Sequence, residues 1–501
     1  MDLPIEIYLL IVERALDEAR VLADAIAQYP GVDVVIDLPD TTFQRTVHAI
    51  RVLAPLALVS SQWNAAVTPL LYQQVLLSAR TLPLFFRILL ARPEHAAHLR
   101  LIVFSRDEGE SVLDDQTTDQ LRTALSQLID EAQERLSLDY SALNALLRAA
   151  GSTFSRISFP SIPQGQSASP ALHNVTHVTL SWCRPEHSLA VKGGFGIGEV
   201  LSLFSLPSVR TLEICRLVAI DLWTGFEPIN PDASTVGPRV RHKWQQRMSS
   251  FLGRSTVKNL IFRTSAIHTA LLETFIGIPS GLERFYYHHA GCEVADVGSQ
   301  AFFRMPGAIV TALASSRSRL SLASLELHYT DRSFDLPRLT GFTGLRRLEN
   351  LRHLTCPVRS FAGHRDGPQG WMVPIASALP STLETLDLQL DGFHSLSHDT
   401  VVAQLQAVVQ RDDKLTRLRV AEEEKWTVTV ERRQATRAAY VALRETCKTH
   451  GIEFSFVNRV RINSPWVVSA LTVFASVAVW MRDITSGVGL LGIISRLIVE
   501  M

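Results

Sequence analysis

The sequence predicts an α/β protein in which a small, all-α N-terminal module precedes an irregular solenoid of helices and short parallel strands. Three observations support this prediction. The N-terminal residues follow helical spacing, a recurrent apolar phrase occupies most of the remaining chain, and 501 residues are enough for several domains or one extended repeat array. We expect the module at 1–80, the solenoid at 81–458 and a hydrophobic tail at 459–501.

The first helix of the module is predicted from apolar residues at helical spacing. Leu3 and Ile7 recur on one face, and Pro4 suits the first turn of a helix. Proline, glycine and aspartate then interrupt the pattern at about 17–50. This composition indicates an insertion within the module.

A second helical stretch begins at Leu56. Val59 and Trp63 continue its helical spacing, whereas Thr68 and Pro69 suit an N-cap and the first position of a new helix. The sequence therefore predicts two helices that meet at Pro69, the second continuing to Val75. A further helical run is expected at 82–100.

The solenoid is predicted from a phrase in which one apolar residue is followed three and five positions later by two others. A helical run ending in Pro, Gly or Ser precedes most copies, so each unit reads as helix, turn and short strand. Such units bury their apolar faces by stacking, as in a leucine-rich-repeat solenoid. The copies lie 21 to 48 residues apart, so the solenoid would be irregular.

The alternative is an ordinary α/β domain that matches the phrase through composition. The nine copies are Phe154/Ile157/Phe159, Val175/Val178/Leu180, Val209/Leu212/Ile214, Val257/Leu260/Phe262, Leu282/Phe285/Tyr287, Leu322/Leu325/Leu327, Leu351/Leu354/Cys356, Leu383/Leu386/Leu388 and Leu415/Leu418/Val420.

Charge and cysteine usage restrict the class of partner and the compartment. The 49 basic and 49 acidic residues balance, so no overall charge draws the chain to nucleic acid. The five cysteines are scattered, which favours reduced, buried thiols. The acidic N-terminus does not match a secretory signal. We expect a cytoplasmic or nuclear protein.

No motif predicts catalysis, a cofactor or a metal site. The glycines at 193–198 lack the spacing of a dinucleotide fingerprint or a P-loop. His288 and His289 are adjacent, so in a strand they would point to opposite faces and could not chelate one ion together. No cluster of arginines forms a visible basic pocket in the sequence. We therefore expect a non-enzymatic protein without catalytic or metal-binding residues.

The tail contains an apolar run at 465–481 without charged residues. It would form about 25 Å of helix, slightly less than the hydrocarbon thickness of a bilayer. The run can therefore serve as a tail anchor in a membrane, or as a hydrophobic helix that caps the solenoid.

The two N-terminal segments together resemble the F-box, in the F-box-like form abundant in fungal proteins. The opening LPIEI, the LALVSSQW segment and the PLLY segment match its pattern in order, and the insertion at 17–50 departs from it. The resemblance implies a three-helix module that docks on a Skp-type adaptor. The residues that it implies for adaptor binding are Leu3, Pro4, Ile7, Leu56, Leu58, Val59, Ser60, Trp63, Pro69, Leu70, Leu71 and Tyr72.

The same resemblance implies a function for the whole chain. An F-box followed by repeats would make it a non-catalytic substrate receptor of an SCF-type (Skp, cullin, F-box) ubiquitin ligase, joined through the adaptor to a cullin-RING ligase. The repeats would hold a protein substrate whose identity the sequence leaves open. Val59 and Trp63 can equally form the core of the module. The alternative function is a protein-interaction scaffold without ligase duty, which the apolar tail can attach to a membrane.

Overall fold

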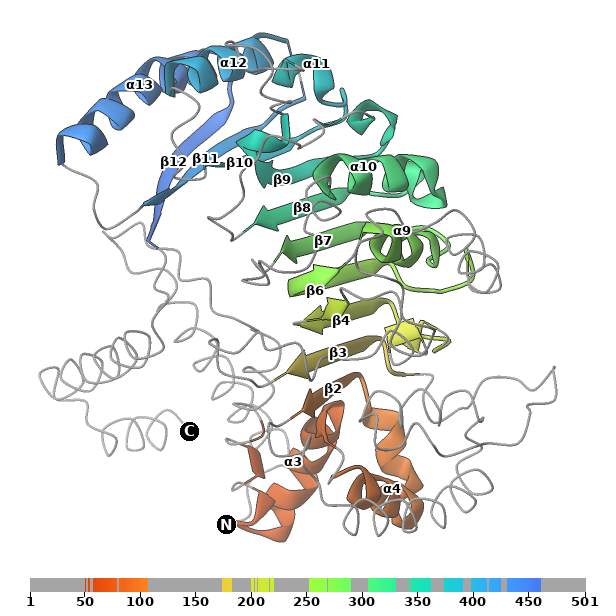
Figure 1. Cartoon of the computed structure of the whole chain (residues 1–501). Helices are drawn as coiled ribbons and strands as arrows, with labels where there is room; N and C mark the ends of the chain where they lie inside the picture. The colour runs from red at the N-terminus through yellow and green to blue at the C-terminus, as the bar shows by residue number, and fades with distance from the viewer. Residues whose placement is uncertain are drawn as a thin grey trace, which may run out of the picture.

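The computed structural model shows an α/β chain built on one long parallel sheet (Figure 1). The residues that it describes are 50, 53–54, 57–78, 81–106, 174–182, 200–201, 203–204, 206–215, 217–219, 252–267, 269–289, 305–329, 342, 344–361, 374–390, 398–411, 414–424 and 430–460.

The twelve strands of this sheet follow one another in nearly sequential order. Each strand pairs in parallel with the next along the chain, except that β5 pairs only with β6, so β4 and β6 are neighbours. Parallel neighbours need a crossover connection between them. A sheet that grows one strand per crossover in a single direction is solenoid-like. The strands are β1 (Gln74–Leu77), β2 (Leu101–Arg106), β3 (His177–Trp182), β4 (Thr211–Cys215), β5 (Val218–Ala219), β6 (Asn259–Ile267), β7 (Arg284–His289), β8 (Ser324–Tyr329), β9 (His353–Pro357), β10 (Thr385–Leu390), β11 (Arg417–Glu424) and β12 (Glu453–Val460).

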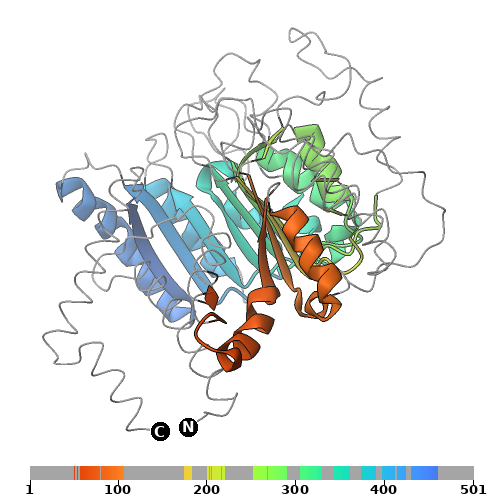
Figure 2. The same cartoon turned by 90° about the horizontal axis from the view of Figure 1, so that it is seen from below.

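Helices from α9 to α13 lie along one side of the sheet (Figure 1), and the view from below shows that the sheet is curved (Figure 2). The described α-helices are α3 (Ser61–Gln73), α4 (Leu82–Ala91), α9 (Thr269–Gly277), α10 (Met305–Ser315), α11 (Ile375–Ala378), α12 (His398–Arg411) and α13 (Val430–Thr449). The described 3-10 helices are η1 (Pro93–His98), η6 (Arg317–Leu320), η7 (Leu345–Arg347) and η8 (Val358–Phe361).

The apolar phrase forms the core between this sheet and the helices. In all eight described copies, from Val175/Val178/Leu180 to Leu415/Leu418/Val420, each of the three residues is 4% exposed or less. They belong to one continuous hydrophobic cluster that begins at Leu77 and ends at Ile452. The prediction of an α/β chain with stacked parallel strands is therefore confirmed. The ninth copy, Phe154/Ile157/Phe159, lies outside the described residues.

The sheet extends beyond the predicted copies at both ends. In β2, Ile102 and Phe104 are buried and pair in register with Val75 and Leu77 of β1. At the other end, β12 does not follow the three-residue apolar phrase, because the turn between α13 and β12 is shorter than the turn between α12 and β11. There Gly451 ends α13 with a φ of 70°, and Ile452 is buried in the position of the first apolar residue.

The predicted boundary between two helices at Pro69 is wrong, because α3 is a single helix with Pro69 inside it. The N-cap is Ser60, whose Oγ accepts a hydrogen bond from the backbone N of Trp63 at 3.2 Å. The Thr68 hydroxyl donates instead to Oδ1 of Asn64 at 3.2 Å, so it caps nothing.

The predicted continuation of this helix to Val75 is also wrong. The backbone N of Arg100 donates to the carbonyl of Gln73 at 3.1 Å, and the four residues after Gln73 pair with β2 as strand β1. Strand pairing thus ends the helix, and the sheet begins inside the segment predicted as an all-α module. The run at 82–100 is helical as predicted, as α4 followed by η1.

Candidate functional site

The residues that the F-box resemblance implies for adaptor binding fall into three groups. Leu3, Pro4, Ile7 and Leu56 lie outside the described residues. Leu58 and Val59 lie in the turn before α3 and are 86% and 65% exposed. The remaining residues belong to α3, except for its exposed N-cap, Ser60.

Trp63 belongs to a small hydrophobic cluster separate from the main core. Leu53 and Val67 are its buried members, and Ala57, Trp63, Leu70 and Leu71 pack against them. The sequence groups Leu58 and Trp63 on one docking face, whereas the structure gives Trp63 a packing role and leaves Leu58 in solvent. Of the described residues expected to bind the adaptor, Leu58, Val59 and Ser60 are therefore the most accessible.

The end of α3 is held against η1 by an aromatic stack. The rings of Tyr72 and His95 lie 4.3 Å apart between centroids and are inclined by 17°. Burial raises the pKa of the Tyr72 hydroxyl and lowers the pKa of His95. Tyr72 therefore joins the N-terminal helix to the start of the sheet, and this contact restricts its access to an adaptor.

Helix α4 adds exposed apolar residues that the sequence reasoning did not single out. Leu84 and Ile88, one helical turn apart, are 54% and 40% exposed, while Phe86 and Leu89 face the core. Together with Leu58 and Val59, they make up four of the seven large exposed hydrophobic residues in the described part of the chain. The signal was present in the sequence, because every residue of α4 except Arg87 is apolar, unlike in an ordinary surface helix.

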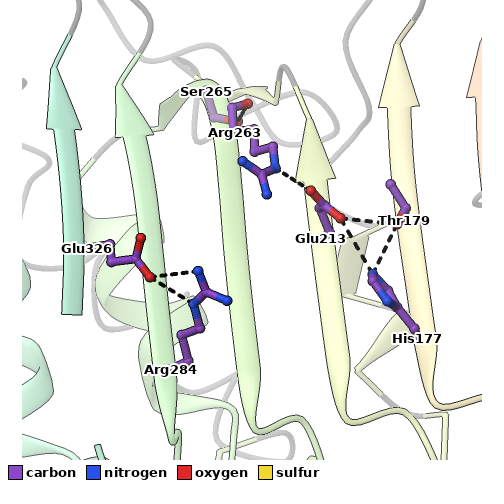
Figure 3. Close-up of polar contacts among 7 residues, drawn as sticks. All are labelled: His177, Thr179, Glu213, Arg263, Ser265, Arg284 and Glu326. Atoms are coloured by element: carbon purple, nitrogen blue, oxygen red, sulfur yellow. Dashed lines mark hydrogen bonds and ion pairs between the residues drawn. The ribbon is translucent and has the colours of Figure 1, made fainter. Parts of the chain in front are cut away.

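The side of the sheet that faces away from the core carries a buried network of charges. Glu213 of β4 is 1% exposed and forms an ion pair with Arg263 of β6 (Figure 3). On its other side, His177 of β3 approaches at 3.5 Å, and the Thr179 hydroxyl donates to Oε2 at 3.5 Å. Burial by itself would lower the pKa of the Arg263 guanidinium, but the charge and hydrogen bond of Glu213 raise it above its usual value. Arg263 therefore remains charged beside Glu213.

Aromatic and imidazole rings continue this side of the sheet. The Arg263 guanidinium lies 4.9 Å from the ring centroid of Tyr286, which is 5.0 Å from the ring of His328. His288 lies 6.0 Å from His328, between ring centroids. Arg284 and Glu326 form a second ion pair at 2.7 Å (Figure 3). This combination of paired charges and polar rings suits protein recognition.

The prediction for His288 and His289 is confirmed, because they lie on opposite faces of β7. His289 is buried, with Nδ1 at 3.1 Å from the Tyr287 hydroxyl, whereas His288 is half-buried beside His328. Within the described ranges no group of three or more His, Cys, Asp or Glu residues could hold a metal ion.

Access to this side of the sheet changes along the solenoid. Residues at the central outward position are buried in β2, β3 and β4, where they are Val103, Thr179 and Glu213. The equivalent residues from Tyr286 of β7 to Arg419 of β11 are half-buried. The C-terminal half of the sheet is therefore the more accessible half for a partner.

The apolar run at 465–481, which the sequence offers as a membrane anchor, lies outside the described residues. Among the helices that the structure describes, none has both the length and the apolar character needed to cross a membrane.

A scan against models of known protein families found no match, and a search of curated proteins found none either.

Proposed function

We propose that this protein is a non-catalytic substrate receptor of an SCF-type ubiquitin ligase. Its N-terminal helices dock on a Skp-type adaptor, and its leucine-rich-repeat-type sheet holds a protein substrate. The observation that carries the proposal is the exposure of Leu58 and Val59 in the turn before α3, directly ahead of the solenoid-like sheet. Large apolar side chains this exposed suit a protein interface better than a free surface.

The order of elements supports this assignment. Helix α3 runs directly into β1, and its C-terminal Tyr72 is stacked on His95. An adaptor bound at the turn before α3 would thus be connected to the sheet through a short, packed segment. A receptor needs such a connection, because the ligase must hold its substrate at a defined position.

Purified full-length protein and a Skp-type adaptor provide the test, with affinity measured by calorimetry. Replacing both Leu58 and Val59 by Ala should weaken binding by about 30-fold or more, as expected if they form a hot spot. The matched control replaces Leu320 and Val441, which are also exposed, by Ala. It should bind like the wild type.

Trp63→Ala perturbs packing and docking together, unlike the change of the exposed Leu58 and Val59. Because Trp63 packs in the small cluster around Val67, we expect this change to lower the stability of the N-terminal helices as well as the affinity. A folded wild-type protein without measurable adaptor binding would refute the proposal. The non-ligase interaction scaffold, tail-anchored or not, would then be the better description.

A further inference from the structure

Four consecutive turns lie side by side at the amino ends of β6, β7, β8 and β9. Each leads into the next strand, at residues 252–258, 278–284, 316–323 and 344–352, and helices α9 and α10 precede the second and third of them. Hydrogen bonds join each turn to the next. Ser280 N donates to the Ser255 carbonyl at 3.0 Å, Leu282 N to Ser318 Oγ at 3.0 Å, and Glu349 N to the Arg319 carbonyl at 3.2 Å.

These turns concentrate positive charge. They contain eight basic side chains and two glutamates, a net charge of six positive, whereas the 49 basic and 49 acidic residues of the whole chain balance. All of the basic side chains except the half-buried Lys258 are exposed. We name this surface the arginine edge, and its basic residues are Arg254, Lys258, Arg284, Arg317, Arg319, Arg346, Arg347 and Arg352.

Half of these charges are paired. Lys258 lies 3.6 Å from Glu283, Arg284 lies 2.7 Å from Glu326, and Arg319 and Arg352 lie 3.6 Å from Glu349 and Glu384. Exposed pairs at 3.6 Å are weak and readily exchange partners.

The other four arginines have no acidic partner within the described part of the chain. Arg254, Arg346 and Arg347 form no ion pair there, and Arg317 donates only to the carbonyl of Gly253 at 3.5 Å. The Arg317 guanidinium lies directly over Gly253, since a Cβ at that glycine would be 3.0 Å from Cζ. The stacking of the turns thus brings Arg317 beside the segment that carries Arg254. Among the described residues, the charges of these four arginines are therefore not compensated by an ion pair.

We propose that the arginine edge binds an extended acidic segment of a partner protein through its carboxylates or phosphorylated side chains. The proposal rests on the proposed receptor function, for which it names the class of substrate. Seven of the eight basic residues are arginine, whose planar fork pairs with carboxylate and phosphate in a bidentate manner. Adjacent strands are about 4.8 Å apart, so four turns span about 14 Å, the length of four to five extended residues.

Binding of labelled octapeptides to the full-length protein tests this proposal by fluorescence anisotropy. Three peptides share a Gly and Ser background and carry four glutamates, four phosphoserines or four glutamines. We expect the glutamate and phosphoserine peptides to bind, more weakly as salt is raised, and the glutamine peptide not to bind. Arg346→Gln together with Arg347→Gln should weaken binding by about tenfold.

The matched control is Arg87→Gln together with Arg444→Gln, because both arginines are exposed on helices away from these turns. The control should bind like the wild type. Equal weakening by both double variants, or no binding of either anionic peptide at low salt, would overturn the proposal. Preferential binding of a single-stranded oligonucleotide would also overturn it, since the partner class would then be nucleic acid. No adaptor is present in this assay, so its outcome does not depend on adaptor docking.

Discussion

Neutralising Glu213 should destabilise the protein more than any comparable change of an exposed acidic residue. Glu213→Gln keeps the shape of the side chain but removes the charge that compensates Arg263. Two opposite charges about 4 Å apart attract each other by about 4 kcal/mol at an effective dielectric constant of 20. Removing one partner of a buried pair typically costs about 3–5 kcal/mol.

The loss of stability should fall slightly below that range, because the Arg263 side chain is 26% exposed and water can partly solvate its unpaired charge. We therefore expect a loss of about 2–3 kcal/mol in the free energy of unfolding. The matched control is Glu326→Gln. Its partner Arg284 is 45% exposed, so this change should cost about 1 kcal/mol or less.

Urea unfolding at neutral pH, followed by circular dichroism, measures both changes from the shift of the midpoint at constant slope. A further variant, Glu213→Leu with Arg263→Met, removes both charges and should recover part of the lost stability. A Glu213→Gln variant within about 0.5 kcal/mol of the wild type, or no more affected than Glu326→Gln, would refute the reasoning.

Three further predictions concern packing, backbone conformation and pH. Leu354→Ala opens a cavity in the middle of the solenoid core and should cost about 3 kcal/mol by urea unfolding, whereas the same change at the exposed Leu320 should cost less than about 0.5 kcal/mol. Gly451→Ala should cost about 1 kcal/mol in the same assay, because φ is 70° there although the space is open, and Gly451→Asn should cost less. Burial raises the pKa of the Cys447 thiol to about 11, so its contribution to stability is complete below about pH 9 and is lost as the pH rises through 11. Cys447→Ala should flatten the fall of the urea midpoint between pH 9 and 11, and an unchanged slope would contradict this assignment.

Much of the fold could be predicted because the relevant signal is local. The three positions of a phrase such as Leu322/Leu325/Leu327 lie within one turn and strand, so spacing alone indicates which side chains point inward. The same spacing occurs in Leu99/Ile102/Phe104, all of which are buried, and could have been found. Pro69 was misplaced because its preference for a helix start competes with a better N-cap at Ser60.

The candidate site could be predicted only in part, since it depends on packing between segments. Leu58 and Trp63 both match the F-box pattern, but only the tertiary structure separates an exposed residue from one that packs against Val67. For α4 the apolar composition is visible in the sequence. Which of its residues remain exposed is decided by the sheet against which it packs.

The sequence by itself determined the helix-and-strand repeat, because alternation and spacing act within a few residues. Only the tertiary structure decided which charged side chains meet. Glu213 and Arg263 are 50 residues apart, and Arg317 and Gly253 are 64 residues apart. The entropy of closing a loop changes slowly with its length, so spacings of 21 to 48 residues between phrases do not specify which residues become neighbours. The register of the parallel strands specifies which residues become neighbours. This register arises only when the apolar phrases stack into a common core.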